Sequence, residues 1–161
     1  NISEEAMESI RENIYVNRDL QNELFSSVWS KYGLTRMELL ILLFLSRSAK
    51  NTATDIVERL RVAKSHVSAS VRELEEQGYI EPVYEGSDHR AVHLRLCKKA
   101  DEIIRAGERA QNEFISIVCR GFSQREQEQL KDFIVRMNDN VIEYFKAACR
   151  HQNRQRSVSG R

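Results

Sequence analysis

A run of small and hydrogen-bonding side chains between positions 64 and 72 has the composition of a recognition surface. Val67, Val71 and Leu74 recur at spacings of four and three, which predicts a helix with one face turned toward a core. The opposite face has no acid before Glu73. Short side chains let a helix approach base edges in the major groove of DNA, and a helix N-terminus favours phosphate oxygens. The candidate DNA-contacting residues on this face are Lys64, Ser65, His66, Ser68, Ala69, Ser70 and Arg72.

The same face also fits a plainer interpretation, since Ser and Ala are common on solvated helix surfaces. The acids Glu73, Glu75 and Glu76 would repel phosphate, so we expect the C-terminal end of this helix to point away from DNA.

A charged turn between two predicted strands favours the DNA interpretation. Residues 92–96 alternate between apolar and polar, as in a half-buried strand, and residues 85–88 have turn chemistry. Pro82 lacks an amide donor, so its strand should lie at a sheet edge. Asp88 can hold the guanidinium of Arg90, and an arginine presented in this way suits a narrow minor groove. The plainer alternative is an exposed ion pair of little energetic weight. The tip adds Asp88, His89 and Arg90 to the candidate set.

Helices are predicted on both sides of these two features. Ser or Thr followed three residues later by an acid predicts helix starts at Thr35–Glu38, Thr52–Asp55 and Ser123–Glu126. Residues 39–45 are apolar nearly all round, so their helix should be central and buried. Long amphipathic helices are predicted over 2–32 and 98–120, and another after 123. The resulting fold class is mainly α with a small β wing: a winged helix-turn-helix with a helical region for dimerisation.

Length and charge limit the number of domains and the ways in which the chain could bind nucleic acid. A chain of 161 residues is expected to form one domain. Lys plus Arg number 25 and Asp plus Glu number 24, so binding to nucleic acid by bulk charge is not favoured, although a local basic stripe remains compatible with this balance.

The cysteines indicate the compartment. Cys97, Cys119 and Cys149 are far apart, without a CxxC pair, which suits a reducing cytoplasm. Cys97, near a predicted helix N-terminus, is the best of the three candidates for a redox-sensing thiol, a role that we do not favour. No apolar run is long enough for a transmembrane helix, and no signal peptide is expected.

Catalytic and metal-binding interpretations find little support. The chain has no Gly-rich phosphate loop, nucleophile elbow or HExxH motif. His89, His93 and Cys97 are spaced by four, and four residues of a strand span about 13 Å, too far for one tetrahedral zinc. We therefore expect neither an enzyme nor a cofactor.

Taken together, these motifs resemble the MarR family of bacterial transcription regulators. The resemblance covers about residues 34–104 and depends on Leu34-Thr35, the 52–60 and 65–75 helices, Gly78-Tyr79-Ile80 and the 87–92 turn with its Asp-x-Arg pattern. It implies a dimeric winged-helix regulator, with Arg90 in the minor groove and the helix around 65–72 in the major groove. It further implies a pocket for a small aromatic effector near Trp29 and Tyr32.

The sequence departs from the family pattern at base-reading and capping positions. Ala63 replaces a common Ser before the recognition helix, Ala69 stands where many members have Arg, and Pro82 replaces an Arg in the first wing strand. These departures leave the fold prediction unchanged, but the operator sequence does not follow from the family.

We therefore predict a helical dimerisation region at 1–32 and 98–148, a DNA-binding domain at 33–97 and a disordered basic tail at 149–161. The predicted function is that of a cytoplasmic homodimeric regulator, acting as a ligand-responsive repressor on a pseudo-palindromic operator. The alternative is a winged-helix module that binds protein partners without DNA.

Overall fold

The computed structural model describes residues 2–84 and 91–158, with side chains described as far as 148. Helix α1 (Glu4–Lys31) begins where Ser3 accepts a hydrogen bond from the Ala6 amide, and the chain turns at Gly33, which adopts φ +67°. Helix α2 (Arg36–Arg47) follows. Its predicted capping box is confirmed, because the Thr35 amide donates to Glu38 Oε2 at 2.9 Å and the Glu38 amide donates to Thr35 Oγ1 at 3.2 Å.

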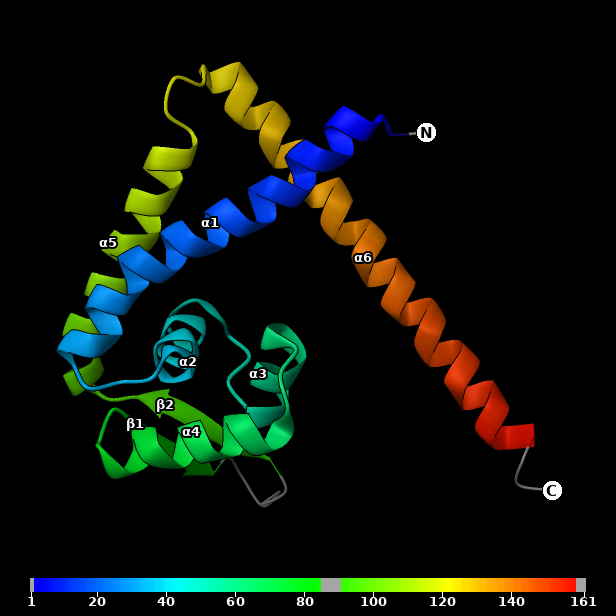
Figure 1. Cartoon of the computed structure of the whole chain (residues 1–161). Helices are drawn as coiled ribbons and strands as arrows, with labels where there is room; N and C mark the ends of the chain where they lie inside the picture. Colours follow the sequence, from blue (N-terminus) through cyan, green and yellow to red (C-terminus); the bar gives the residue numbers. More distant parts are fainter. Residues whose placement is uncertain (1, 85–90, 159–161) are drawn as a thin grey trace. The chain divides into compact units, whose positions relative to one another are not determined.

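The helix-turn-helix consists of α3 (Ala53–Leu60) and α4 (Lys64–Glu76), joined by a short turn (Figure 1). Helix α3 starts with the predicted Thr52–Asp55 capping box. Helix α4 packs against α2, α3 and the first wing strand. At its end Gly78 adopts φ +77°, the left-handed conformation in which glycine commonly ends a helix.

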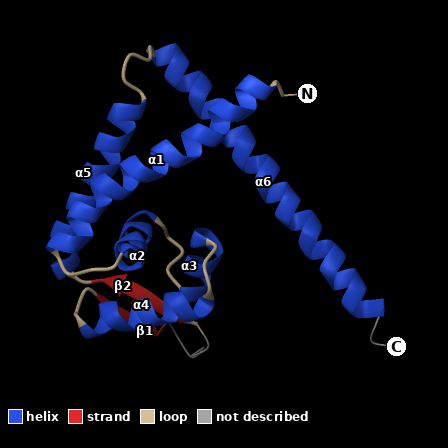
Figure 2. Ribbon diagram, in the orientation of Figure 1, coloured by secondary structure: helices blue, strands red, loops and turns tan. Residues whose placement is uncertain are grey.

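The wing is an antiparallel hairpin of β1 (Ile80–Tyr84) and β2 (Val92–Leu96), the two red arrows in Figure 2. Its register pairs Ile80 with Leu96 and Pro82 with Leu94. Strand β1 has no neighbour other than β2 within the described part of the chain, as expected for a strand that contains proline. The hairpin is followed by a 3₁₀ turn, η1 (Lys98–Ala100), and by α5 (Asp101–Val118).

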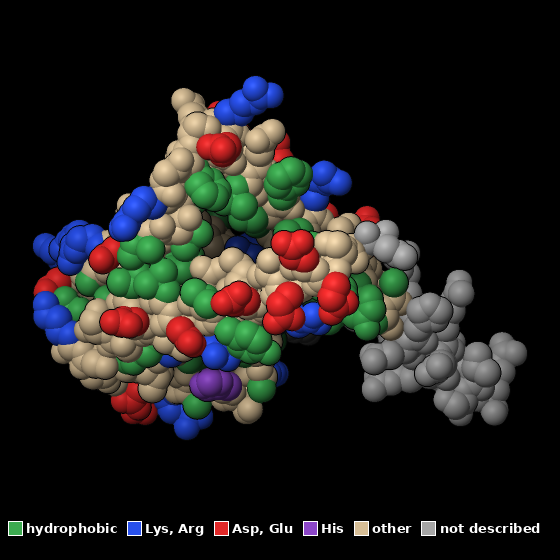
Figure 3. Space-filling view, turned by 45° about the horizontal axis from the view of Figure 1, so that its top comes forward, with side chains coloured by type: hydrophobic (Ala, Val, Ile, Leu, Met, Phe, Trp, Pro, Cys, Tyr) green, Lys and Arg blue, Asp and Glu red, His purple; other side chains and the backbone are tan. Residues whose placement is uncertain are grey.

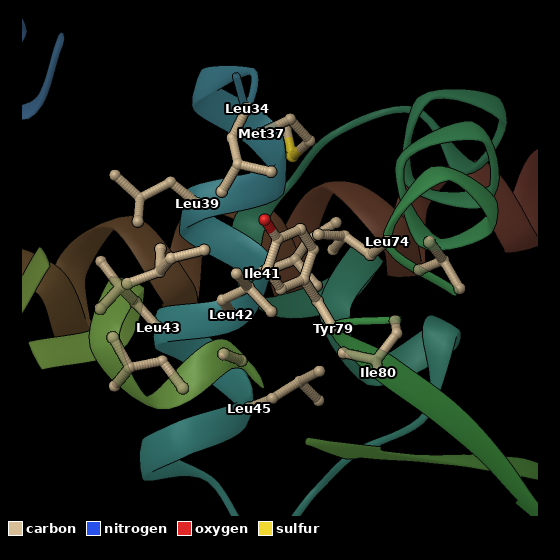
Figure 4. Close-up of a cluster of buried hydrophobic side chains, with 14 of the residues drawn as sticks. Leu34, Met37, Leu39, Ile41, Leu42, Leu43, Leu45, Leu74, Tyr79 and Ile80 are labelled. Atoms are coloured by element: carbon tan, nitrogen blue, oxygen red, sulfur yellow. The ribbon is translucent and has the colours of Figure 1, made fainter. Parts of the chain in front are cut away.

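The core is built around α2, as its apolar sequence predicts. Leu39, Ile41 and Leu42 are at most 1% exposed. Figure 4 shows Ile41 and Leu42 facing Tyr79 and Leu74, which come from the wing entry and from α4. The burial of such side chains stabilises a fold by about 1.5–3 kcal/mol each, so this helix anchors the helix-turn-helix above all other elements.

The chain forms two compact units that divide between Ile117 and Val118. The second unit contains α6 (Gln124–Val158), which starts at the predicted Ser123–Glu126 capping box. Its backbone is helical through 158, whereas the sequence analysis expects disorder from 149. The stretch 149–158 lacks Gly and Pro and is rich in Arg and Gln, so intrinsic helix propensity favours this continuation. None of the described helices combines the length and apolar character that a membrane span requires.

Candidate nucleic-acid interface

Helix α4 divides its residues between two faces. Val67 and Leu74 are fully buried, and Val71 is nearly so, which confirms the predicted core face. The exposed side chains, which form a continuous polar surface from the helix start to its middle, are Lys64, Ser65, His66, Ser68, Ala69 and Arg72. This arrangement leaves the N-terminal half of α4 open to a large ligand.

Ser70 is an exception among the predicted contact residues, because it is only 6% exposed. It follows Val67 by three positions and precedes Leu74 by four, and this spacing turns its side chain toward the core. Its hydroxyl group is small enough to be tolerated there. The placement of Ser70 on the exposed face of α4 is therefore corrected.

The charges of α4 are strongly asymmetric along its axis. The first turn contains Lys64 and no acid, whereas Glu73, Glu75 and Glu76 lie at the other end. The N-cap is Ala63, and no described side chain accepts a hydrogen bond from the first amides. The helix dipole and these uncapped amides both favour an anion at this end. Over the face drawn in Figure 3, basic and acidic side chains are interspersed, in keeping with the near-neutral composition.

The predicted wing-tip residues Asp88, His89 and Arg90 lie outside the described residues. Across the hairpin, the Arg95 guanidinium contacts Glu81 Oε1 at 2.6 Å, and both side chains are exposed.

Strand β2 is also attached to the connection between α2 and α3, a link that the sequence analysis does not foresee. His93 Nδ1 and Asn51 Oδ1 share a hydrogen bond of 2.6 Å, and the Leu94 amide donates to the Asn51 carbonyl at 2.9 Å. The wing is thereby held against the start of α3, whose Thr52 forms a bridge with His93. Hydrogen bonds from the Thr52 amide and hydroxyl hold the pKa of Asp55 below its usual range, and the nearby charges of Lys50 and His93 act in the same direction.

Lys99 connects the end of α4 to the start of α5. Its ammonium group donates to the Gln77 carbonyl at 2.6 Å and lies 4.5 Å from the centroid of the Tyr79 ring. A lysine at a helix C-terminus also complements the dipole. The position of α4 thus depends on both the wing and α5.

A pocket of about 340 Å³ lies between α1, α2 and α5. Its lining includes Trp29, one of the two residues predicted for an effector site, together with Phe25, Phe114, Arg36, Arg47 and Gln111. The buried Gln111 Oε1 has no hydrogen-bond partner among the described residues. Tyr32 does not line this pocket; its hydroxyl group donates to Glu102 Oε1 at 2.8 Å instead.

Among the described residues, the metal and thiol candidates do not form a cluster, and the predicted candidate His89 lies outside those residues. No group of three or more His, Cys, Asp or Glu side chains in the described part of the chain is arranged to hold a metal ion. Cys97 and Cys119 are free and half-buried, and Cys149 lies outside the described side chains.

Comparison with known proteins finds that this chain is similar to regulators of transcription. Residues 32–91 match the model of the MarR family. A curated relative, the HTH-type transcriptional regulator BilQ of Clostridioides difficile, is 25% identical over 99 residues, which cover 62% of this chain and 67% of the relative.

Solved structures share the fold over most of the chain. The transcriptional regulator SlyA superposes with a TM-score of 0.74 at 23% identity, covering 85% of this chain and 96% of that one. A putative MarR family regulator from Listeria monocytogenes, complexed with a 26mer DNA, superposes with a TM-score of 0.74 at 16% identity, covering 83% and 89%.

Proposed function

We propose that the chain is a transcriptional regulator of the MarR type, which binds operator DNA with α4 in the major groove and represses transcription. Support comes from the match of residues 32–91 to the MarR family model and from the curated relative, itself a transcriptional regulator. The observation that carries this proposal is the exposed, acid-free N-terminal half of α4, whose side chains are short or can donate hydrogen bonds. Base edges are read by such side chains, and phosphates are held by basic groups and helix N-termini. Arg90 is proposed as the minor-groove contact of the wing.

The regulator acts as a homodimer in this proposal. The helical regions 1–32 and 98–148 form the dimerisation region, and residues 33–97 form the DNA-binding domain. A two-fold dimer would present two α4 helices about 34 Å apart, one turn of B-DNA, to a pseudo-palindromic operator. Support comes from the exposed apolar side chains of α6, among them Phe133, Met137 and Val141.

A fluorescence anisotropy titration with DNA from upstream of the protein's own gene tests operator binding, with a scrambled duplex as competitor. The informative variant is Ser68→Glu, which places a negative charge in the middle of the exposed face. We expect it to weaken binding to the operator by about tenfold or more, because the charge faces phosphates and displaces a base contact.

The matched control is Gln77→Glu, which adds the same charge at the acidic end of α4 and should leave the affinity within about twofold. If both variants bind like the wild type, α4 does not enter the groove. If the wild type does not prefer the operator to the scrambled duplex, a role in binding protein partners, compatible with the net charge of +1, becomes the better interpretation.

We further propose that the pocket between α1, α2 and α5 receives a small aromatic effector with an acidic group. Its volume of about 340 Å³ lies within the range of ligand sites. Phe25, Trp29 and Phe114 offer ring contacts, whereas Arg36 and Arg47 offer positive charge, and no acid lines the pocket. Since α2 lines this pocket and also packs against α4, a ligand that shifts α2 would displace the recognition helix.

Trp29 is the single tryptophan of the sequence, so its fluorescence reports on the pocket. We expect benzoate to change the emission saturably at concentrations up to roughly 10 mM, the range of a weak ligand. Arg36→Ala should weaken this response several-fold by removing the charge partner. The control Arg105→Ala removes an exposed arginine outside the pocket lining and should change nothing. A non-saturable response, or an equal response in Arg36→Ala, would argue against the site.

A further inference from the structure

The backbone at Arg61, in the turn of the helix-turn-helix, has an unusual conformation. Arg61 is the C-cap of α3, with φ 53° and ψ 46°, and its amide donates to the Val57 carbonyl at 2.9 Å. It is the only non-glycine residue with a positive φ among the described residues. The left-handed region brings the Cβ of an L-residue close to the following carbonyl, so it is costly for arginine.

Glycine occupies the equivalent conformation at three other places in the described part of the chain. Gly33, Gly78 and Gly121 have φ values of +67°, +77° and +84°. Glycine adopts this region without steric cost, and it is the residue most often found there after a helix. Arg61 is exposed, so core packing does not require a large side chain at this position. Residues held in disfavoured backbone conformations cluster at ligand-contacting sites, and this makes the exposed side chain of Arg61 a candidate for a ligand contact.

The surroundings of Arg61 indicate which ligand that side chain would meet. The segment 59–72 contains no acid, and its basic residues are Arg59, Arg61, Lys64 and Arg72. Arg61 precedes Lys64, the first residue of α4, by three positions, at the end of α4 whose amides receive no side-chain cap from any described residue. In a helix-turn-helix the first helix crosses the DNA backbone and the second enters the groove, so the turn between them lies over phosphates.

We propose that Arg61 is a phosphate-contacting residue of the operator complex, with its guanidinium group held by the left-handed turn over the DNA backbone beside the entry of α4. The proposal rests on the proposed function, because it requires α4 to bind DNA. The planar guanidinium fork matches two phosphate oxygens, which a single ammonium does not. A phosphate contact carries no sequence information, so Arg61 contributes to binding of operator and non-operator DNA alike.

Arg61→Gly separates this role from a structural one. If the arginine stabilises the fold, its replacement should lower the melting temperature, whereas a phosphate contact predicts weaker DNA binding without a loss of stability. Glycine removes the steric cost of the left-handed conformation, so the melting temperature should stay the same or rise by up to about 5 °C. The affinity for the operator should nevertheless fall by about tenfold at 0.15 M salt, with a similar fall for a scrambled duplex. The slope of log K against log salt concentration should become shallower by about two, because each protomer of the dimer loses one phosphate contact.

Two further variants complete the design. Arg61→Lys keeps the charge and should retain most of the salt slope while losing part of the affinity. Arg109→Ala removes an exposed arginine from α5 and should preserve both affinity and slope. Wild-type affinity and slope in Arg61→Gly would overturn the proposal, and so would a loss of affinity with an unchanged slope. Failure of the wild type to bind DNA at all would overturn the proposed function along with it.

Discussion

At the scale of single residues, the pair Thr52 and Asp55 shows how a local motif supports the binding surface. Asp55 Oδ2 accepts hydrogen bonds from the Thr52 amide at 3.0 Å and from the Thr52 hydroxyl at 2.8 Å. The Asp55 amide in turn donates to Thr52 Oγ1 at 3.2 Å. Because Thr52 also bridges to the wing strand at His93, this box fixes the start of α3 and the base of the wing together.

The depressed pKa of Asp55 gives this motif a pH signature. The folded-state pKa lies below the unfolded value of about 3.9, so the stabilisation is fully present above that pH and is lost as the pH falls through the folded pKa. Asp55→Asn should therefore lower the free energy of unfolding by about 0.5–1 kcal/mol at pH 7. The gap between variant and wild type should narrow below about pH 4, as measured by urea denaturation across the pH range.

The matched control for this measurement is Glu58→Gln, which exchanges a carboxylate for an amide at an exposed position of the same helix. It should change the free energy of unfolding by no more than about 0.5 kcal/mol at any pH. A constant gap between Asp55→Asn and the wild type from pH 7 to pH 3 would show that the charge of Asp55 does not stabilise the fold.

Sequence reasoning succeeds for residues whose partners lie a few positions away. All three capping boxes and the uncapped Ala63 could be predicted, because each depends on spacings of three within one segment. Ser70 and Arg61 could not be resolved in this way. Whether Ser70 is buried depends on the rotation of α4 against α2. The left-handed conformation of Arg61 could not be predicted either, because the other described residues with a positive φ are glycines and an arginine gives no such signal.

At the scale of elements, the contact between α2 and α5 depends on Gly107. A Cβ at this position would lie 2.9 Å from Leu43 Cδ2 and 3.3 Å from Leu39 Cδ1, so the absence of a side chain allows the two helices to approach closely. Glycine within a helix costs about 1 kcal/mol relative to alanine, and close packing against α2 offsets that cost. The sequence shows the glycine but not its partner, which lies more than sixty positions away.

The contacts between elements provide a route by which a ligand in the proposed effector pocket would change the position of α4. Lys99 ties its C-terminal end to α5, and α2 packs along its buried face. The proposed effector pocket is lined by residues of these same two helices, α2 and α5. A ligand that changes their separation would therefore act on both supports of the recognition helix, while the hydrogen bond between His93 and Asn51 keeps the wing with α3.

At the scale of the whole molecule, the exposed apolar residues of α6 require a partner. Apolar side chains that recur at spacings of three and four form a stripe along one side of the helix, which includes Phe133, Ile134, Met137, Val141, Tyr144 and Phe145. The exposed fractions of these side chains range from 43% for Phe145 to 70% for Tyr144. A contiguous apolar surface of this kind is typical of a protein interface, and the partner that the proposed function assigns to it is a second copy of this chain.

Two valines of α6 allow a matched test of this interface. Val141 lies within the stripe and is 52% exposed, whereas Val135 is 47% exposed and lies about 120° away around the helix, outside the stripe. Val141→Glu should place two charges in the apolar interface of a dimer and shift it to monomers at micromolar concentration, because unpaired buried charges are costly. Val135→Glu makes the same substitution outside the stripe and should leave the dimer intact. Sedimentation velocity distinguishes these outcomes directly. A monomeric wild type, or equal behaviour of the two variants, would mean that the stripe does not join two copies.

The affinity for the operator should fall in Val141→Glu and stay unchanged in Val135→Glu, because a monomer places only one α4 on the DNA and loses the added affinity of the second half-site.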